Sequence, residues 1–189
     1  MPLPHRERVL RAATSSFLAR GYGSSVDDIA RRAGVAKQTV YQHFASKDEL
    51  FKEVARDLAR QVLVELENGE VRDSLLRFAQ GYRKRALGAQ GIATFRTLVP
   101  EVPRFRALAR AMYANTAGEM VRRVAEFLAR AAAQGKLSVP DPEFSAEMLF
   151  SMLAGHDRLK RLFAVPRGAE SEAARTARIV DCFLRAHHA

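Results

Sequence analysis

Polar residues between positions 37 and 47 have the types and spacing that contact with a nucleic acid requires. The amide of Gln38 can pair with the edge of an adenine, and the hydroxyl of Tyr41 can donate to a phosphate. Lys47 adds positive charge at a helix start, where free backbone N–H groups also attract phosphate. We predict that nucleic acid is contacted by Ser25, Lys37, Gln38, Thr39, Tyr41, Gln42, His43 and Lys47.

No other group of residues has the pattern of a catalytic or metal site. The sequence contains no glycine-rich phosphate loop, no Ser-His-Asp set and no carboxylate pair at glycosidase-like positions. Asp27 and Glu49 fall at helix starts, where carboxylates favour the helix dipole. The histidines lack metal-ligand spacing, and we interpret the terminal His187-His188 pair as a frayed end. We therefore expect no enzyme activity, no cofactor and no metal, with Cys182 packed as a small apolar residue at an interface.

Two short helices separated by Gly34-Val35-Ala36 are predicted to position the polar set. The first begins at Ser25 in a capping-box pattern and ends at the glycine. The second runs over about 37–44, with Val40 and Phe44 on the side that packs against its neighbours. Two short helices joined in this way form a helix-turn-helix, whose second helix reads the major groove of DNA.

The rest of the chain is predicted to be helical as well. Alanine and arginine are abundant, and no run alternates with the period of a strand. A first helix is expected over about 5–20, and a fourth begins after Ser46. Glycine and proline breaks then predict five longer helices, over 72–88, 91–99, 104–134, 142–164 and 170–187. The predicted fold class is all-α, with about nine helices.

Length and hydropathy limit the class of protein. The chain has 189 residues, which suits one domain or a small domain joined to a larger one. No stretch approaches the ~18 apolar residues of a membrane span, and the first residues lack the apolar run of a secretory signal. We expect a soluble, cytoplasmic protein with no membrane partner.

The N-terminal pattern resembles the DNA-binding domain of the tetracycline-repressor (TetR) family. About a dozen positions agree in order over 12–51, among them Phe17, Gly21-Tyr22, Ser25 to Ala30, Ala33 to Val35, Thr39 to Tyr41, His43-Phe44, Ser46-Lys47 and Leu50-Phe51. One position departs from the family, because Ala36 replaces the Ser or Thr that often caps the recognition helix. That change removes a cap worth about 1 kcal/mol. The segments 95–105 and 135–137 also resemble a subgroup of such repressors described as AefR-like.

The resemblance implies an all-helical homodimer that represses transcription from a palindromic double-stranded DNA operator. Residues 1–46 would form the helix-turn-helix domain, and 47–189 a helical effector-binding and dimerisation domain, with the helix from 47 linking the two. The dimer would form through the last two helices, over about 142–164 and 170–187. A small hydrophobic or acidic effector would shift the separation of the two reading heads. Its predicted cavity is lined by Phe78, Tyr82, Phe95, Leu98, Met112, Tyr113, Met120 and Met152.

The positive charge is concentrated outside the predicted DNA-binding residues. Of the net charge of +10, residues 1–60 carry an excess of 4, whereas residues 72–110 carry an excess of 7. The second excess has three interpretations: solvated helix surface, attraction of DNA at a distance, or one or two arginines turned inward to pair with an acidic effector.

The sequence pattern allows other functions besides a ligand-released repressor. An architectural DNA-binding protein without an effector would have a fully packed C-terminal interior, so a cavity there distinguishes the two hypotheses. An activator of the same family would have the same sequence pattern. A small helical enzyme is disfavoured because no catalytic constellation is present.

Overall fold

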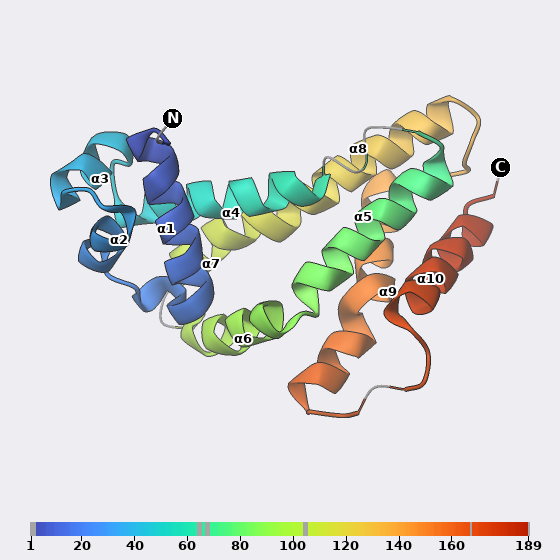
Figure 1. Cartoon of the computed structure of the whole chain (residues 1–189). Helices are drawn as coiled ribbons and strands as arrows, with labels where there is room; N and C mark the ends of the chain where they lie inside the picture. Colours follow the sequence, from blue (N-terminus) through green and yellow to red (C-terminus); the bar gives the residue numbers. More distant parts are fainter. Residues whose placement is uncertain (1–2, 64–65, 67–68, 104–105, 167, 189) are drawn as a thin grey trace. The chain divides into compact units, whose positions relative to one another are not determined.

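The described residues fold into helices and the turns that join them, as predicted. The computed structural model describes residues 3–63, 66, 69–103, 106–166 and 168–188, and no strand occurs within these ranges. A π-helical turn, Ala114–Gly118, makes α7 and α8 one continuous stretch, so the described part of the chain has nine helical stretches, the expected number. The helices are α1 (His5–Arg20), α2 (Val26–Ala33), α3 (Lys37–His43), α4 (Lys47–Leu63), α5 (Val71–Ala86), α6 (Ala89–Leu98), α7 (Arg106–Tyr113), α8 (Glu119–Ala133), α9 (Pro142–Leu162) and α10 (Glu172–Ala186) (Figure 1).

The chain divides into two compact units. The first, here called the N-terminal unit, comprises Met1–Leu58 and Ala93–Thr116, and the second, the C-terminal unit, comprises Ala59–Ile92 and Ala117–Ala189. The predicted domain division between residues 46 and 47 stays a prediction. Among the described residues, no helix combines the length and apolar character that crossing a bilayer demands.

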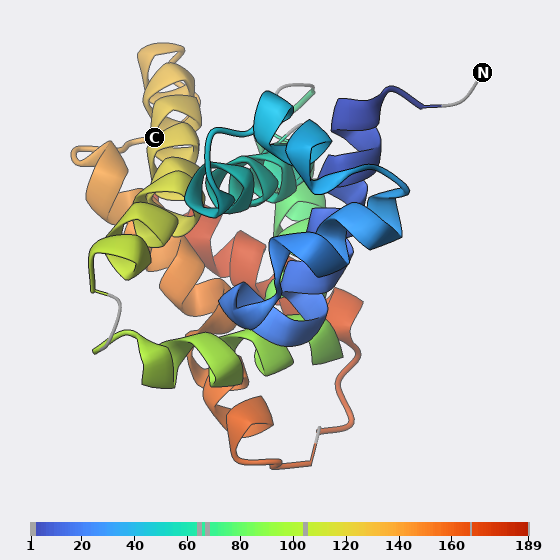
Figure 2. The ribbon, with the colours of Figure 1, turned by 90° about the vertical axis from the view of Figure 1, so that its left-hand side faces the viewer.

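The N-terminal unit is built around the apolar faces of α1 to α4. α1, α2 and α3 lie together in both views of the chain (Figure 1, Figure 2). Val9, Ile29 and Leu50 are completely buried where these helices meet. The ring of Phe17 packs edge-on against Phe51 with centroids 4.8 Å apart, an arrangement that aromatic pairs favour. This core fixes the position of α3, the predicted recognition helix.

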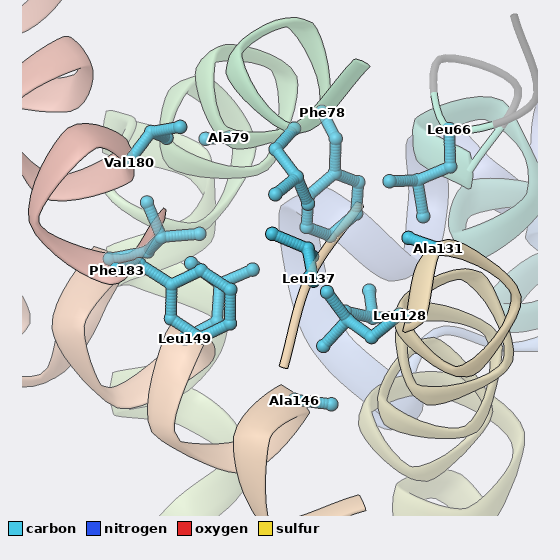
Figure 3. Close-up of a cluster of buried hydrophobic side chains, with 13 residues drawn as sticks. Leu66, Phe78, Ala79, Leu128, Ala131, Leu137, Ala146, Leu149, Val180 and Phe183 are labelled. Carbon is cyan, nitrogen blue, oxygen red and sulfur yellow. The ribbon is translucent and has the colours of Figure 1, made fainter. Parts of the chain in front are cut away.

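The C-terminal unit has a separate core, to which α5, α8, α9 and α10 contribute. Phe78, Leu128, Leu149 and Phe183 are fully buried and point toward one another (Figure 3). The first turn of α6 lies close against the end of α5, because a Cβ atom at Gly91, within α6, would collide with the backbone carbonyl of Arg85. Burial of these rings and leucines, at about 1.5–3 kcal/mol each, supplies the main driving force for packing the unit.

A buried arginine joins three helices of the C-terminal unit. The side chain of Arg83, on α5, is only 2% exposed. Its Nη2 donates to Asp157 on α9 at 2.9 Å and to Glu172 on α10 at 2.7 Å, and its Nη1 donates to the backbone carbonyl of Leu153. Asp157 accepts a further bond from Arg175 at 2.6 Å. Arg83 therefore turns inward, as one interpretation of the basic excess over 72–110 allowed, but it pairs with carboxylates of its own chain.

The C-terminal histidine pair differs from the prediction of a frayed end, which is wrong for His187. Its ring is 6% exposed and lies on the ring of Phe183, with centroids 4.3 Å apart. Nδ1 is 2.9 Å from the Phe183 carbonyl oxygen, Nε2 is 3.0 Å from Ser145 Oγ, and the His187 carbonyl accepts from Ser138 N–H at 2.9 Å. These contacts with two other segments order the end of α10, which sequence position alone did not reveal.

Asp157→Asn is expected to lower the free energy of unfolding at neutral pH, with a deficit that shrinks on acidification. Burial by itself would raise the pKa of the Asp157 carboxyl, but hydrogen bonds from Arg175 and Arg83 outweigh burial and hold the pKa below its usual value. A depressed pKa adds stability that is complete above the unfolded pKa and is lost as the pH falls through the native pKa. Urea denaturation of the wild-type protein and the variant, at steps from about pH 7 to about pH 2.5, measures the deficit on both sides of the native pKa.

Leu149→Ala serves as the control for this titration. It removes a fully buried apolar side chain, at a cost of about 2–5 kcal/mol, and no proton is involved. Its deficit should therefore persist at every pH at which the protein folds. An Asp157→Asn deficit that is equally independent of pH would contradict the assigned ion pairs.

Candidate nucleic-acid interface

The predicted helix-turn-helix is present, and local backbone chemistry defines both ends of α2. The Ser25 hydroxyl accepts a bond from the Asp28 N–H at 3.1 Å, as the capping pattern predicts. Gly34 ends the helix with a φ of +63°, in the left-handed region that favours glycine. The Val35 N–H then reaches back to the Ala30 carbonyl at 3.0 Å, which completes the usual glycine-dependent helix stop.

An arginine from α1 completes the turn between α2 and α3. Arg8 Nε donates to the Ala33 carbonyl at 2.9 Å, and Arg8 Nη2 donates to the Gly34 carbonyl at 2.7 Å. These carbonyls lie at the end of α2, where no following helical turn can supply donors. The planar guanidinium meets the two carbonyls with two separate nitrogens held in a fixed geometry, which the single ammonium nitrogen of a lysine lacks. The sequence alone does not single out Arg8, because nothing in it distinguishes this residue from the other arginines of α1 before α2 is placed beside it.

α3 separates a buried side from an exposed side, as a recognition helix requires. Val40 is 1% exposed and Phe44, directly after the helix, is 5% exposed, so both belong to the core. On the opposite side the predicted contact residues Lys37, Gln38, Tyr41, Gln42 and His43 are exposed, and Thr39 is half-buried. Ala36 provides no side-chain cap at the start of the helix, as its residue type predicts.

Lys37 already has a partner within the protein. Its Nζ is 3.0 Å from an Asp27 carboxylate oxygen at the start of α2. The hydrogen bond that the ammonium donates to this carboxylate is the main reason that the pKa of Lys37 lies above its usual value. Both side chains are more than half exposed, so a phosphate can compete for the ammonium group. Asp27 therefore stands beside the predicted contact surface as a competing acceptor.

Lys47 also occupies a defined place. Ser46 Oγ accepts from the Glu49 N–H at 3.1 Å, as predicted for the start of α4. The Lys47 ammonium lies 4.2 Å from the centre of the Tyr22 ring, within the range of a cation–π contact. Burial lowers the pKa of Lys47, and the nearby Asp48 carboxylate opposes that change. The predicted phosphate contact of Lys47 stays a prediction, as do those of the other seven residues.

The side chains predicted to line an effector cavity are divided between the two units. Phe78, Tyr82, Met120 and Met152 lie in or against the core of the C-terminal unit, whereas Phe95, Met112 and Tyr113 belong to the N-terminal unit. The side chain of Leu98 lies outside the described residues. Tyr113 is 60% exposed and lines an open groove of about 630 Å³. Which of these residues contact an effector stays a prediction.

Two parts of the chain match families of bacterial regulators. Residues 9–54 match the family described as bacterial regulatory proteins, tetR family. Residues 73–189 match the C-terminal domain of AefR-like transcriptional repressors. The second match covers more than half of the chain, and together the two matches span most of both units.

Individual proteins agree with these matches. Over 53 residues the chain is 51% identical to the transcriptional activator FasR of Mycolicibacterium smegmatis, and over 73 residues it is 38% identical to the transcriptional repressor DhaR of Mycobacterium sp. strain GP1. These alignments cover 26% and 36% of this chain, and they span only 24% of FasR and 37% of DhaR. A solved TetR-family regulator from Mesorhizobium loti is 26% identical, with a TM-score of 0.75 over 98% of this chain and 97% of its own. The flavonoid-responsive regulator FrrA is 28% identical, with a TM-score of 0.72 over 97% of each chain.

Arg8→Lys is expected to lower the free energy of unfolding by about 1–2 kcal/mol, because the Ala33 and Gly34 carbonyls lose charge-assisted hydrogen bonds. Arg11→Lys is the matched control on the same helix, since Arg11 is 70% exposed and its ion pair with Glu7 measures 3.8 Å. Urea denaturation of the two variants measures the difference. Equal stability of the two variants would show that Arg8 does not support the turn.

Proposed function

Because the chain belongs to the TetR family and has an AefR-like C-terminal domain, it is a DNA-binding transcriptional regulator, and we propose that it is a homodimeric repressor released by a small-molecule effector. The observation that carries the proposal is the exposed side of α3. Its amide, hydroxyl and basic groups stand opposite the buried Val40 and Phe44, so the core orients them outward together. A chromosomal operator would place the repressor in the cytoplasm.

The residues predicted to contact DNA have different proposed roles, because their side chains differ in chemistry. Gln38 is proposed to read a base edge, since an amide can both donate to and accept from adenine. Lys37, Tyr41 and Lys47 are proposed to hold phosphates, with Thr39, Gln42 and His43 beside them on the same helix. Ser25 joins this set through its hydroxyl, which accepts the Asp28 N–H bond and still has a hydrogen to donate.

The proposed dimer forms through α9 and α10. On α9, the apolar side chains of Phe144 and Leu159 are 62% and 53% exposed, and a partner helix would cover them. Gly155 lies exposed between them, and a Cβ atom there would meet nothing within 4 Å. Cys182 on α10 is also exposed, which agrees with its predicted place at an interface. A dimer would place two recognition helices in successive major grooves, about 34–36 Å apart.

The effector part of the proposal rests on space within the helical C-terminal unit. A cavity of about 380 Å³ lies between α5, α9 and α10, which favours an effector over a purely architectural role. Release requires that the effector bind the DNA-incompetent state more tightly. To change operator occupancy from 99:1 to 1:99, that preference must reach about 5.5 kcal/mol.

The proposal is tested by selecting binding sites from random duplex DNA with the purified full chain, followed by footprinting. A palindromic footprint, with half-sites one helical turn apart, is the expected result. Equal protection of unrelated sequences would contradict an operator-reading function. A reporter gene placed behind the selected site then separates the two regulatory modes, since a repressor lowers and an activator raises its expression.

Asp27→Asn is expected to raise affinity about two- to tenfold on every duplex, because the substitution frees Lys37 and removes a negative charge near the phosphates. The dependence of affinity on salt should become steeper, since the freed ammonium displaces a further counterion. Fluorescence anisotropy at several salt concentrations measures both quantities.

Two further variants make this experiment specific. Glu7→Gln is the matched control, since Glu7 is an exposed acid paired with an exposed arginine on α1. It should reproduce only the general effect of one lost negative charge. Gln38→Ala should instead weaken binding to the selected operator and relax discrimination at one base pair of each half-site, by about 1–3 kcal/mol. If the Asp27→Asn variant binds DNA no more tightly than the Glu7→Gln variant does, Asp27 does not compete with phosphate for Lys37.

A further inference from the structure

We propose that the cavity between α5, α9 and α10 binds a small organic anion with a carboxylate head and a short apolar body, an inference that rests on the effector site proposed above. The cavity is partly open to solvent and has a volume of about 380 Å³, within the range of small-molecule sites. All three helices belong to the C-terminal unit and pack against one another (Figure 1). The site therefore depends on no contact with the N-terminal unit.

Basic side chains outnumber acidic ones around the cavity. Arg83 and Lys84 reach it from α5 and Arg161 from the end of α9, whereas Glu172 on α10 is the only acid among its lining residues. Lys84 is exposed and makes no ion pair within the described part of the chain. The lining thus carries an excess of positive charge, with one ammonium group available for a ligand.

The internal ion pairs already mark a position for a carboxylate. The Glu172 carboxylate accepts from Arg83 Nη2 at 2.7 Å through one oxygen and from Arg161 through the other. Glu172 is 43% exposed, although its partner Arg83 is only 2% exposed. Asp157 and the Leu153 carbonyl hold Arg83 from the other side, so the guanidinium stays in place when Glu172 moves. A ligand carboxylate placed between Arg161 and Lys84 would meet donors like those that Glu172 uses.

The remaining wall suits an apolar body. Leu87 lines the cavity and is 2% exposed, and Gly88 and Ala173 add small groups beside it. Thr176 also lines the cavity, but its hydroxyl donates to the Glu172 backbone carbonyl at 2.6 Å. Because this polar group has its own partner, it does not require one from the ligand. In the proposed complex a short alkyl chain packs against these nonpolar groups while the carboxylate faces the basic side chains.

Calorimetric titration of the full chain with octanoate tests the site, and octanol, of equal chain length without the charge, is the matched control probe. Saturable binding of octanoate is expected, with octanol at least about tenfold weaker, because only the carboxylate gains charge-assisted hydrogen bonds. Octanoate affinity should also fall as ionic strength rises. Equal binding of the two probes, or no saturable binding of octanoate, would overturn the proposal.

Lys84→Met locates the carboxylate. The substitution retains an unbranched side chain of similar length and removes the charge, so octanoate affinity should fall about threefold or more. Lys136→Met is the control, because Lys136 is exposed in the same unit and lies outside the cavity lining. Unchanged octanoate affinity in Lys84→Met would overturn the proposed site. Direct binding is measured without DNA, so this outcome is independent of the proposed repression.

Discussion

The hydrogen bonds from Arg8 to the Ala33 and Gly34 carbonyls are the constraint on which the candidate DNA interface depends. A turn of three residues must hold α3 at a fixed angle to α2, although each helix has only two turns or so of its own hydrogen bonds. Gly34 supplies the left-handed backbone that ends α2, and Arg8 ties that end to the longer α1. Once the turn is fixed, burial of Val40 orients the whole exposed side of α3 outward.

Much of the positive charge of this DNA-binding regulator is used within the protein. Arg83 joins three helices of the C-terminal unit, Lys37 pairs with Asp27, and Lys47 rests on the ring of Tyr22. These contacts differ in burial and therefore in consequence. The exposed Lys37 can exchange its carboxylate for a phosphate, whereas the buried Arg83 cannot leave Asp157 without a large desolvation cost. Net charge alone would not separate these roles.

The basic excess over 72–110 connects the fold to the proposed ligand site. One of its arginines, Arg83, turned inward as one interpretation of the sequence allowed, but Asp157 and Glu172 neutralise it. Its neighbour Lys84 lines the cavity and is the basic group proposed to meet an external anion. The same segment of α5 thus contributes one residue to stability and one to the proposed cavity, because successive residues of a helix point about 100° apart.

The sequence by itself determined the helices, the helix-turn-helix and the family, because these depend on local signals. Ser25, Gly34 and Ser46 act within one turn of their own positions, and apolar spacing shows which side of each helix is buried. Only the tertiary structure decided the roles of Arg8, Arg83 and His187. The hydrogen-bond partners of Arg8 and Arg83 lie 25 to 89 residues away in the sequence, and Ser145, a partner of His187, lies 42 residues away. The role of such a polar side chain depends on the donors and acceptors that tertiary packing places beside it. No local sequence pattern predicts which donors and acceptors these are.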